Sequence, residues 1–320
     1  MSKRKLNNRQ RHRITQAQDQ FQQDTGNTQT GLVLCRHGKR AQIETPNGQR
    51  MDCYIRPNLP TLVAGDNIVW QPMLEQHTGI IVSCFPRETV LERIDKHGLA
   101  KPLAANLTQL VIVLAHKPAV IWRMIDSYLI TAASQNIEAC LVLNKTDLPS
   151  NNERTILDSY YKPLGYPIFY TNQQDPSSYA ALTLQLASQV SIFVGQSGVG
   201  KSSLTATFLP HLSEQIETAS LSNDQHGQHT TSNPRYYHLP EGGAIIDSPG
   251  VRSFQPAQCS ISMIINGYKE LRPFIGQCQF RNCSHLSTPG CAFTHALETN
   301  AISAFRYNQF IQMLFDIPNQ

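Results

Sequence analysis

A glycine-rich segment in the second half of the chain restricts the possible folds more than any other feature. Residues 195–202, GQSGVGKS, fit the pattern GxxxxGK[ST] between an apolar stretch, VSIFV, and a helix-forming stretch, SSLTATFL. Between a strand and a helix, glycines let the backbone N–H groups of the loop turn inward around a phosphate. This context favours a phosphate-binding loop over an ordinary glycine-rich turn. Lys201 would bridge the β- and γ-phosphates as a candidate catalytic residue, and Ser202 would offer its hydroxyl to Mg²⁺. The candidate phosphate-binding residues are Gly195, Gln196, Ser197, Gly198, Val199, Gly200, Lys201 and Ser202.

A second motif predicts which base the site binds. Asn144, Lys145, Thr146 and Asp147 follow the apolar stretch ACLVL. The Asp147 carboxylate can accept two hydrogen bonds from the N1–H and exocyclic amine of guanine, whereas adenine would leave it unpaired. Alone, the motif is also compatible with a polar turn in which Asp147 caps a helix. Together with a phosphate loop in the same chain, it predicts a guanine nucleotide site.

A third motif and a polar segment predict the magnesium ligands and the group that activates water. Asp247-Ser248-Pro249-Gly250 follows the strand-like stretch AII and matches a DxxG element, with Asp247 near Mg²⁺ and the Gly250 N–H at the γ-phosphate. In the polar stretch before it, Thr230 or Thr231 could complete the Mg²⁺ coordination.

The residue after this motif is Val251, where many regulatory GTPases have a water-orienting glutamine. A valine cannot hold a water molecule, so either hydrolysis is slow until a partner helps or another side chain does the work. His229 is the best candidate, and a loop histidine with no catalytic role is the alternative.

The three motifs occur in an unusual order, because the guanine motif at 144 precedes the phosphate loop at 195 and the DxxG element at 247. The same site can be assembled if the original termini are joined and new ones are opened in a surface loop. The chain then leaves the DxxG element directly into its C-terminal region, so nucleotide state could move an appended domain.

That C-terminal region contains a metal-binding pattern. Cys278, Cys283, His285 and Cys291 supply three thiolates and one imidazole within 14 residues, which is typical of a closed, structural zinc site. Disulfides are the alternative, and the absence of a secretory signal disfavours them. The other cysteines are interpreted as isolated core or surface residues: Cys35, Cys53, Cys84, Cys140 and Cys259.

The rest of the chain predicts the domain organisation. Residues 1–14 hold six basic side chains and no acid, although the formal net charge of the 320-residue chain is only +4. Such an arm can bind nucleic-acid phosphates or be a solvated terminus without a specific role. The stretch from Gly31 to about Arg93 has short β-branched segments and an Asn47-Gly48 turn, which predict a small OB-type barrel.

Beyond residue 105, apolar strands alternate with helix-length segments, which predicts a parallel sheet covered by helices. The fold class is therefore α/β, with an OB-type barrel, a circularly permuted P-loop GTPase domain and a zinc-binding helical domain. The proposed domains are a basic and polar arm at 1–30, a barrel at 31–95, a GTPase domain at 96–257 and a zinc domain at 258–320. No apolar run approaches the roughly 18 residues of a membrane helix, so a cytoplasmic protein is expected.

The motif order and the Cys/His spacing resemble the circularly permuted ribosome small subunit-dependent GTPase A family. The resemblance implies GTP hydrolysis to GDP, stimulated by the small ribosomal subunit late in its maturation. It also implies rRNA contact, Mg²⁺ with the nucleotide, one structural zinc and no membrane association, and we expect a monomer. Asn144–Asp147 and Gly195–Ser203 match the family's GTP contacts, and the Cys/His cluster matches its zinc ligands. His229 matches the switch histidine.

Two departures from the family pattern stand out. The switch motif reads Gly227-Gln228 instead of Gly-Arg, and Thr171-Asn172 replaces the Ser-Ala element of the guanine loop. Rival interpretations are an RNA-binding assembly module with a structural nucleotide, a permuted GTPase acting on the large subunit, and a zinc-dependent hydrolase. A closed ligand set disfavours the last.

Overall fold

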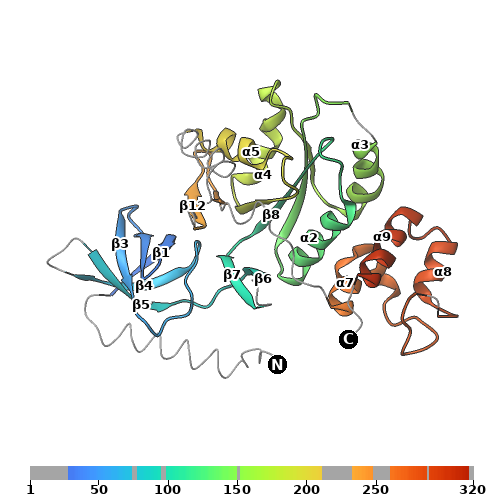
Figure 1. Cartoon of the computed structure of the whole chain (residues 1–320), viewed down its shortest axis with the longest axis horizontal. Coiled ribbons are helices and arrows are strands. Elements are labelled where there is room, and N and C mark those ends of the chain that lie inside the picture. Colours follow the sequence, from blue (N-terminus) through green and yellow to red (C-terminus); the bar gives the residue numbers. More distant parts are fainter. Residues whose placement is uncertain are drawn as a thin grey trace, which may run out of the picture.

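The computed structural model describes residues 28–73, 78–94, 99–149, 152–210, 233–247, 260–286 and 288–316. These residues form an N-terminal barrel, a central α/β unit and a C-terminal helical unit, arranged in a row (Figure 1). The basic arm at residues 1–14 lies outside the described ranges. Among the described helices, none is long and apolar enough to cross a membrane.

The N-terminal unit is a closed five-stranded barrel, as the sequence predicts. Its strands follow the order β1-β2-β3-β5-β4, and pairing of β1 with β4 closes it. The Asn47-Gly48 turn joins β2 to β3, with Gly48 at a φ of +80° that favours glycine. The strands are β1 (Gln29–His37), β2 (Arg40–Glu44), β3 (Arg50–Ile55), β4 (Asn67–Met73) and β5 (Thr78–Cys84).

A separate hairpin connects the barrel to the α/β unit. β6 (Val90–Ile94) pairs with β7 (Ala100–Ala105) in a two-stranded sheet, although the sequence pattern assigned the stretch up to Arg93 to the barrel. The reason is that the partner strand, β7, follows directly in the sequence and pairs locally. The proposed boundary at residue 95 falls between these two strands, and the division into domains stays a prediction.

The central unit has a mostly parallel sheet in the order β10-β9-β8-β11-β13-β12, with β12 antiparallel to β13. Every residue of β8 is buried, as expected for a central strand covered on both faces. Leu110, Ile112 and Leu114 face one core and Val111 and Val113 face the other. The strands are β8 (Gln109–Ala115), β9 (Glu138–Asn144), β10 (Ile168–Tyr170), β11 (Val190–Val194), β12 (Arg235–His238) and β13 (Ala244–Asp247).

Helices cover the two faces of this sheet. α2 packs with the turn Leu157–Tyr161 on one face, whereas α4 and α5 pack on the other. Figure 1 shows α4 and α5 together on the side of the sheet away from α2. The helices are α2 (Trp122–Ser134), α3 (Glu153–Ile156), α4 (Ala180–Leu186) and α5 (Lys201–Phe208).

The C-terminal unit docks on α2 through a small apolar core and a buried polar network. It contains α7 (Ile261–Gly267), a 3₁₀ turn (Lys269–Phe274), α8 (Ala292–Glu298) and α9 (Ala304–Phe315). A Cβ added at Gly267 would lie 2.6 Å from Ile130 of α2, so glycine permits this close approach.

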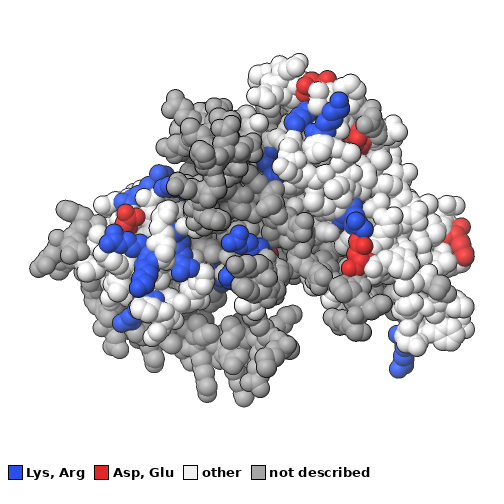
Figure 2. All heavy atoms as spheres, in the orientation of Figure 1, with Lys and Arg blue, Asp and Glu red and all other residues white. Residues whose placement is uncertain are grey.

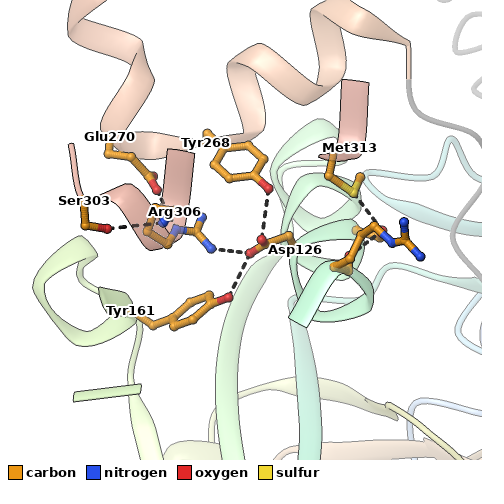
Figure 3. Close-up of polar contacts among 9 residues, drawn as sticks. Asp126, Tyr161, Tyr268, Glu270, Ser303, Arg306 and Met313 are labelled. Atoms are coloured by element: carbon orange, nitrogen blue, oxygen red, sulfur yellow. Dashed lines mark hydrogen bonds and ion pairs between the residues drawn. The ribbon is translucent and has the colours of Figure 1, made fainter. Parts of the chain in front are cut away.

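The buried network centres on Asp126 of α2, as Figure 3 shows. Its carboxylate accepts hydrogen bonds from the Arg306 guanidinium of α9, from the Tyr268 hydroxyl at 2.9 Å and from the Tyr161 hydroxyl at 3.2 Å. Arg306 also donates to Glu270 at 2.6 Å. Asp126 is 1% exposed and Arg306 is 4% exposed, so the charges that join the two units are paired away from water.

Candidate functional site

The predicted phosphate loop joins β11 to α5 at the carboxyl edge of the parallel sheet. Gly195, Gly198 and Gly200 have φ values of +140°, +83° and +99°, which a residue with a Cβ rarely adopts. Lys201 is the first residue of α5, and its ammonium donates to the carbonyls of Gly195 at 2.8 Å and Gln196 at 2.6 Å. The lysine charge therefore lies inside the loop.

Two of these glycines also leave no space for a side chain. A Cβ at Gly195 would lie 2.1 Å from the carbonyl oxygen of Val113, and one at Gly200 would lie 2.3 Å from Nδ2 of Asn144. The loop is thus in direct contact with β8 on one side and with the predicted guanine motif on the other.

Hydrogen bonds join the phosphate loop to the guanine motif. The buried Asn144 amide donates to the Val199 carbonyl at 3.0 Å, and the Lys145 ammonium donates to the Gly198 carbonyl at 2.5 Å. Two motifs that lie about fifty residues apart, in reversed order, therefore form one edge of the sheet. Lys145 has a φ of +59°, which turns the chain sharply after β9.

Thr171 orients the Asn144 amide. It is fully buried, and its hydroxyl donates to Oδ1 of Asn144 at 3.0 Å, which leaves Nδ2 directed at Val199. The Thr171 carbonyl also accepts from the backbone N–H of Thr146 at 3.2 Å. The sequence analysis identified the Thr171-Asn172 position as a departure from the family pattern. It could not predict that Thr171 orients Asn144, because the two residues lie 27 positions apart and no local sequence pattern links them.

Asp147, the predicted guanine-reading residue, is exposed at the same edge. Burial raises the pKa of Tyr179, and the negative charge of Asp147 adds to that rise. An exposed carboxylate can accept hydrogen bonds from a planar base that enters from solvent.

The predicted magnesium ligands lie in part within the described residues. Ser202 is a half-buried residue in the first turn of α5, and Asp247 ends β13. Because β11 and β13 are parallel neighbours, their carboxyl ends meet at one edge, where hydroxyl and carboxylate oxygens suit Mg²⁺. His229, Thr230, Thr231, Gly250 and Val251 lie outside the described residues.

The sequence identified Gln196 as a residue of the phosphate loop but did not predict the contacts that its side chain makes outside the loop. Its side-chain amide donates to the Ala119 carbonyl at 3.0 Å, and its side-chain oxygen accepts from the Ile121 N–H at 3.1 Å. This pair of bonds holds the loop to the segment that precedes α2, a helix whose N-terminus has no side-chain cap.

The Cys/His pattern forms one compact cluster. The Nδ1 atom of His285 lies 3.6 Å from Sγ of Cys278, 3.7 Å from Sγ of Cys283 and 3.6 Å from Sγ of Cys291. In a tetrahedral zinc site, the usual Zn–S and Zn–N lengths separate sulfur from nitrogen by about 3.6 Å. These four side chains can therefore hold a metal ion, and the spacing matches zinc.

Neighbouring residues hold the cluster in place. The backbone N–H of Ala292 donates to Sγ of Cys278 at 3.4 Å, and the His285 ring stacks on the buried Phe293 ring with centroids 4.1 Å apart. Burial raises the pKa of Cys278 to about 11 and lowers the pKa of His285. The lowered pKa of His285 favours the neutral imidazole, which is the form that binds metals, whereas the raised pKa of Cys278 means that a bound cation must itself favour the thiolate.

The comparisons with known proteins agree with this geometry. The chain matches the RsgA GTPase family over residues 84–257. The small ribosomal subunit biogenesis GTPase RsgA of Alcanivorax borkumensis is 39% identical over 98% of this chain and 96% of its own length. The protein of the same name from Proteus mirabilis is 38% identical over 98% of this chain and 96% of its own length.

Two solved structures resemble the whole chain. YjeQ from Thermotoga maritima aligns with a TM-score of 0.73 and 25% identity, covering 92% of this chain and 99% of its own. YloQ, described as a circularly permuted GTPase, aligns with a TM-score of 0.70 and 21% identity, covering 93% of this chain and 99% of its own. The fold predicted from the sequence, with a barrel, a permuted P-loop unit and a C-terminal helical unit, is confirmed.

Proposed function

Because this chain belongs to the RsgA GTPase family of GTP-hydrolysing enzymes, we propose that it converts GTP to GDP and phosphate on the small ribosomal subunit. The step belongs to the late maturation of that subunit, and the subunit stimulates hydrolysis. Two relatives that match nearly the whole chain carry the name small ribosomal subunit biogenesis GTPase, which supports this assignment.

One observation carries the proposal at the level of chemistry. The Asn144 amide bonds to the Val199 carbonyl, so the guanine motif and the phosphate loop are held in one site although their order is reversed. A base at Asp147 and a triphosphate at the loop could therefore be bound at the same time. The site can therefore hold a whole GTP molecule in one place, as hydrolysis requires.

The roles of the site residues follow from the family motifs. GTP is bound by Asn144–Asp147, by Gly195–Ser203 and by the Gly250 N–H, with Lys201 stabilising charge on the transferred phosphate. Ser202, Asp247 and one of Thr230 and Thr231 would hold Mg²⁺, whose charge would help to neutralise the negative charge that develops on the phosphates. His229 orients the attacking water in place of the glutamine that Val251 replaces.

Zinc is the proposed metal of the Cys278, Cys283, His285 and Cys291 cluster, with a structural role. Four protein ligands complete a tetrahedral shell, so no position is left for a water nucleophile. The cluster joins the loop at residues 278–285 to the start of α8, whose first residue follows Cys291.

The proposed contact with rRNA involves the barrel and the basic arm at residues 1–14. Figure 2 shows Lys and Arg side chains gathered over the barrel on the face in view. Lys39, Arg40, Arg50 and Arg56 are exposed barrel cations, and such charges bind phosphates by releasing counterions. We propose that the chain acts as a monomer in the cytoplasm, where it meets the subunit.

Steady-state turnover with separated ribosomal subunits tests this function. We expect small subunits to raise GTP turnover by at least about tenfold, equal to about 1.4 kcal/mol of barrier, and large subunits to leave it unchanged. Lys201→Ala should lower the stimulated rate by about a hundredfold or more. Stimulation by large subunits alone would show that the large subunit is the partner. Hydrolysis of no more than one GTP per protein chain would show that the bound nucleotide is structural.

A further inference from the structure

The barrel and the central sheet form one continuous sheet. β12 is the last strand of the central sheet, and it pairs antiparallel with β1 of the barrel at Cys35 and Arg235. An edge strand has unpaired N–H and C=O groups that an added strand can satisfy. Here the added strand is β1 of the barrel, which pairs with the edge strand β12 where the two units meet in Figure 1.

The strand that the barrel covers belongs to the nucleotide site. β12 begins four residues after Thr231, one of the proposed magnesium ligands, and leads through a hairpin to β13, which ends at Asp247. The pairing is continuous over the whole hairpin, with Arg235 opposite Asp247 and His238 opposite Ala244. Continuous strand pairing therefore joins β12 to the Asp247 end of β13.

A single row of paired residues connects Asp247 to the barrel. Arg235 is directly opposite Asp247 on one side and opposite Cys35 on the other, and Cys35 is directly opposite Gln42 of β2. Directly paired residues share one face of a sheet, with Cβ atoms about 5 Å apart. The row therefore runs Asp247, Arg235, Cys35, Gln42 on one face.

The Arg235 side chain spans this row. Its Nη2 donates to Oε1 of Gln42, across the buried Cys35, which is 2% exposed. Burial raises the pKa of the Cys35 thiol and the positive charge of Arg235 opposes that rise, which agrees with a guanidinium above the thiol. One arginine thus bonds to the barrel through its side chain while its backbone faces Asp247.

We propose that Arg235 is a positioning residue for Asp247, and that the barrel acts on the magnesium-binding end of β13 through the Gln42–Arg235 hydrogen bond. This inference rests on the proposed function, because it explains how a particle bound to the barrel changes the rate at the nucleotide. Movement of the barrel must either break this bond or move Arg235, and with it Asp247.

A second contact between the same units provides a matched control. His238 Nε2 lies 2.6 Å from Oε1 of Glu44, at the end of β12 that is opposite Ala244 instead of Asp247. Glu44→Gln weakens the docking of the barrel without touching the Arg235 row. A general docking effect and a specific effect on Asp247 are thereby separated.

The test compares Gln42→Leu, Gln42→Glu and Glu44→Gln in the full chain. We expect Gln42→Leu to reduce stimulation by small subunits about tenfold, while GTP affinity and unstimulated turnover stay within about twofold of the wild type. Gln42→Glu keeps an acceptor for the guanidinium and should restore stimulation if Gln42→Leu folds poorly. Adding Arg235→Met to Gln42→Leu should cause no further loss of stimulation, because each substitution removes the same Arg235–Gln42 hydrogen bond.

Amide hydrogen exchange gives a second measurement that needs no turnover. Gln42→Leu should speed exchange at the Asp247 end of β13 by about tenfold, and Glu44→Gln should not. Unchanged exchange and normal stimulation in Gln42→Leu would overturn the inference, as would an equal loss in Glu44→Gln. If wild-type protein is not stimulated at all, the proposed function fails, while the exchange result still decides the role of Arg235.

Discussion

Replacing Arg306 with alanine will destabilise the docking of the C-terminal unit on α2 by about 3–5 kcal/mol, because it removes one partner of a buried charge network. Arg306 donates to Asp126 and to Glu270, and all three side chains are less than a tenth exposed. Without the guanidinium, the buried carboxylates of Asp126 and Glu270 lose the positive charge that pairs with them.

Trp122 can report this docking directly. Its ring stacks on Tyr161 at 5.7 Å and meets Phe305 of α9 edge-on at 5.8 Å, so its fluorescence changes when α9 leaves. The other tryptophan of the chain, Trp70, is in the barrel core and can be replaced by phenylalanine in the reference protein. Urea unfolding then follows the surroundings of Trp122, without a contribution from the barrel tryptophan.

Arg123→Ala is the matched control for the same two helices. Arg123 forms an ion pair with Asp316 at 2.7 Å, but the two side chains are 46% and 51% exposed. Solvent-exposed pairs contribute about 0–1 kcal/mol, so this variant should unfold almost as the reference does. Equal effects of Arg123→Ala and Arg306→Ala would contradict the account of the buried network.

The loss in Arg306→Ala should also depend on pH. In the wild type, burial raises the pKa of Asp126, while Arg306 and the Tyr268 hydroxyl oppose that rise. Removing Arg306 raises the folded-state pKa of Asp126 further above its unfolded value, so the folded state binds more protons. Stability of the variant should therefore increase as the pH falls through the folded-state pKa of Asp126 toward its unfolded value, and it should decrease as the pH rises back through the folded-state pKa.

Removal of the metal is expected to have the largest effect on structure. We expect zinc chelation, or Cys291→Ser, to unfold the region beyond about residue 270, because structural zinc sites contribute about 10–16 kcal/mol of binding free energy. Cys291 directly precedes α8, and His285 stacks on Phe293 in the core of this unit. Without the metal, neither the start of α8 nor the His285 ring is held to the rest of the cluster.

Nucleotide affinity should stay within about threefold of the wild type, since the GTP site is built on β8, β9 and β11. Elemental analysis should find one zinc per chain, and hydrogen exchange should find the loss of protection confined to the C-terminal unit. Cys84→Ser, outside the cluster, is the matched control. Loss of GTP binding together with zinc would show that the two units are not independent.

Local patterns predicted the parts of the fold that depend on short-range order. The apolar run at 109–115 is β8, and the helical spacing near the C-terminus is α9 (Ala304–Phe315). The phosphate loop and the guanine motif follow parallel strands, so their place at one sheet edge follows from topology. The Cys/His spacing predicted a cluster that the structure brings within 4.8 Å.

The contacts between units could not be predicted in the same way. Arg235 and Cys35 are paired across 200 residues, and Asp126 and Arg306 meet across 180, so neither pair leaves a periodic signal. Asp126 is an acid among the otherwise hydrophobic residues on the buried face of α2, which indicates a partner without identifying it. His229, Thr230 and Thr231 stay predictions, because they lie outside the described residues.

Guanine recognition by Asp147 is the most direct test of a nucleotide site assembled from motifs in reversed order. The measurement is the affinity of wild type and Asp147→Asn for GTP, ATP and xanthosine triphosphate. We expect the variant to lose about a hundredfold in GTP affinity, because its amide cannot accept both guanine hydrogen bonds. It should gain affinity for xanthine, whose C2 carbonyl can accept from the new amide group. An unchanged preference for GTP over ATP and xanthosine triphosphate would contradict the site.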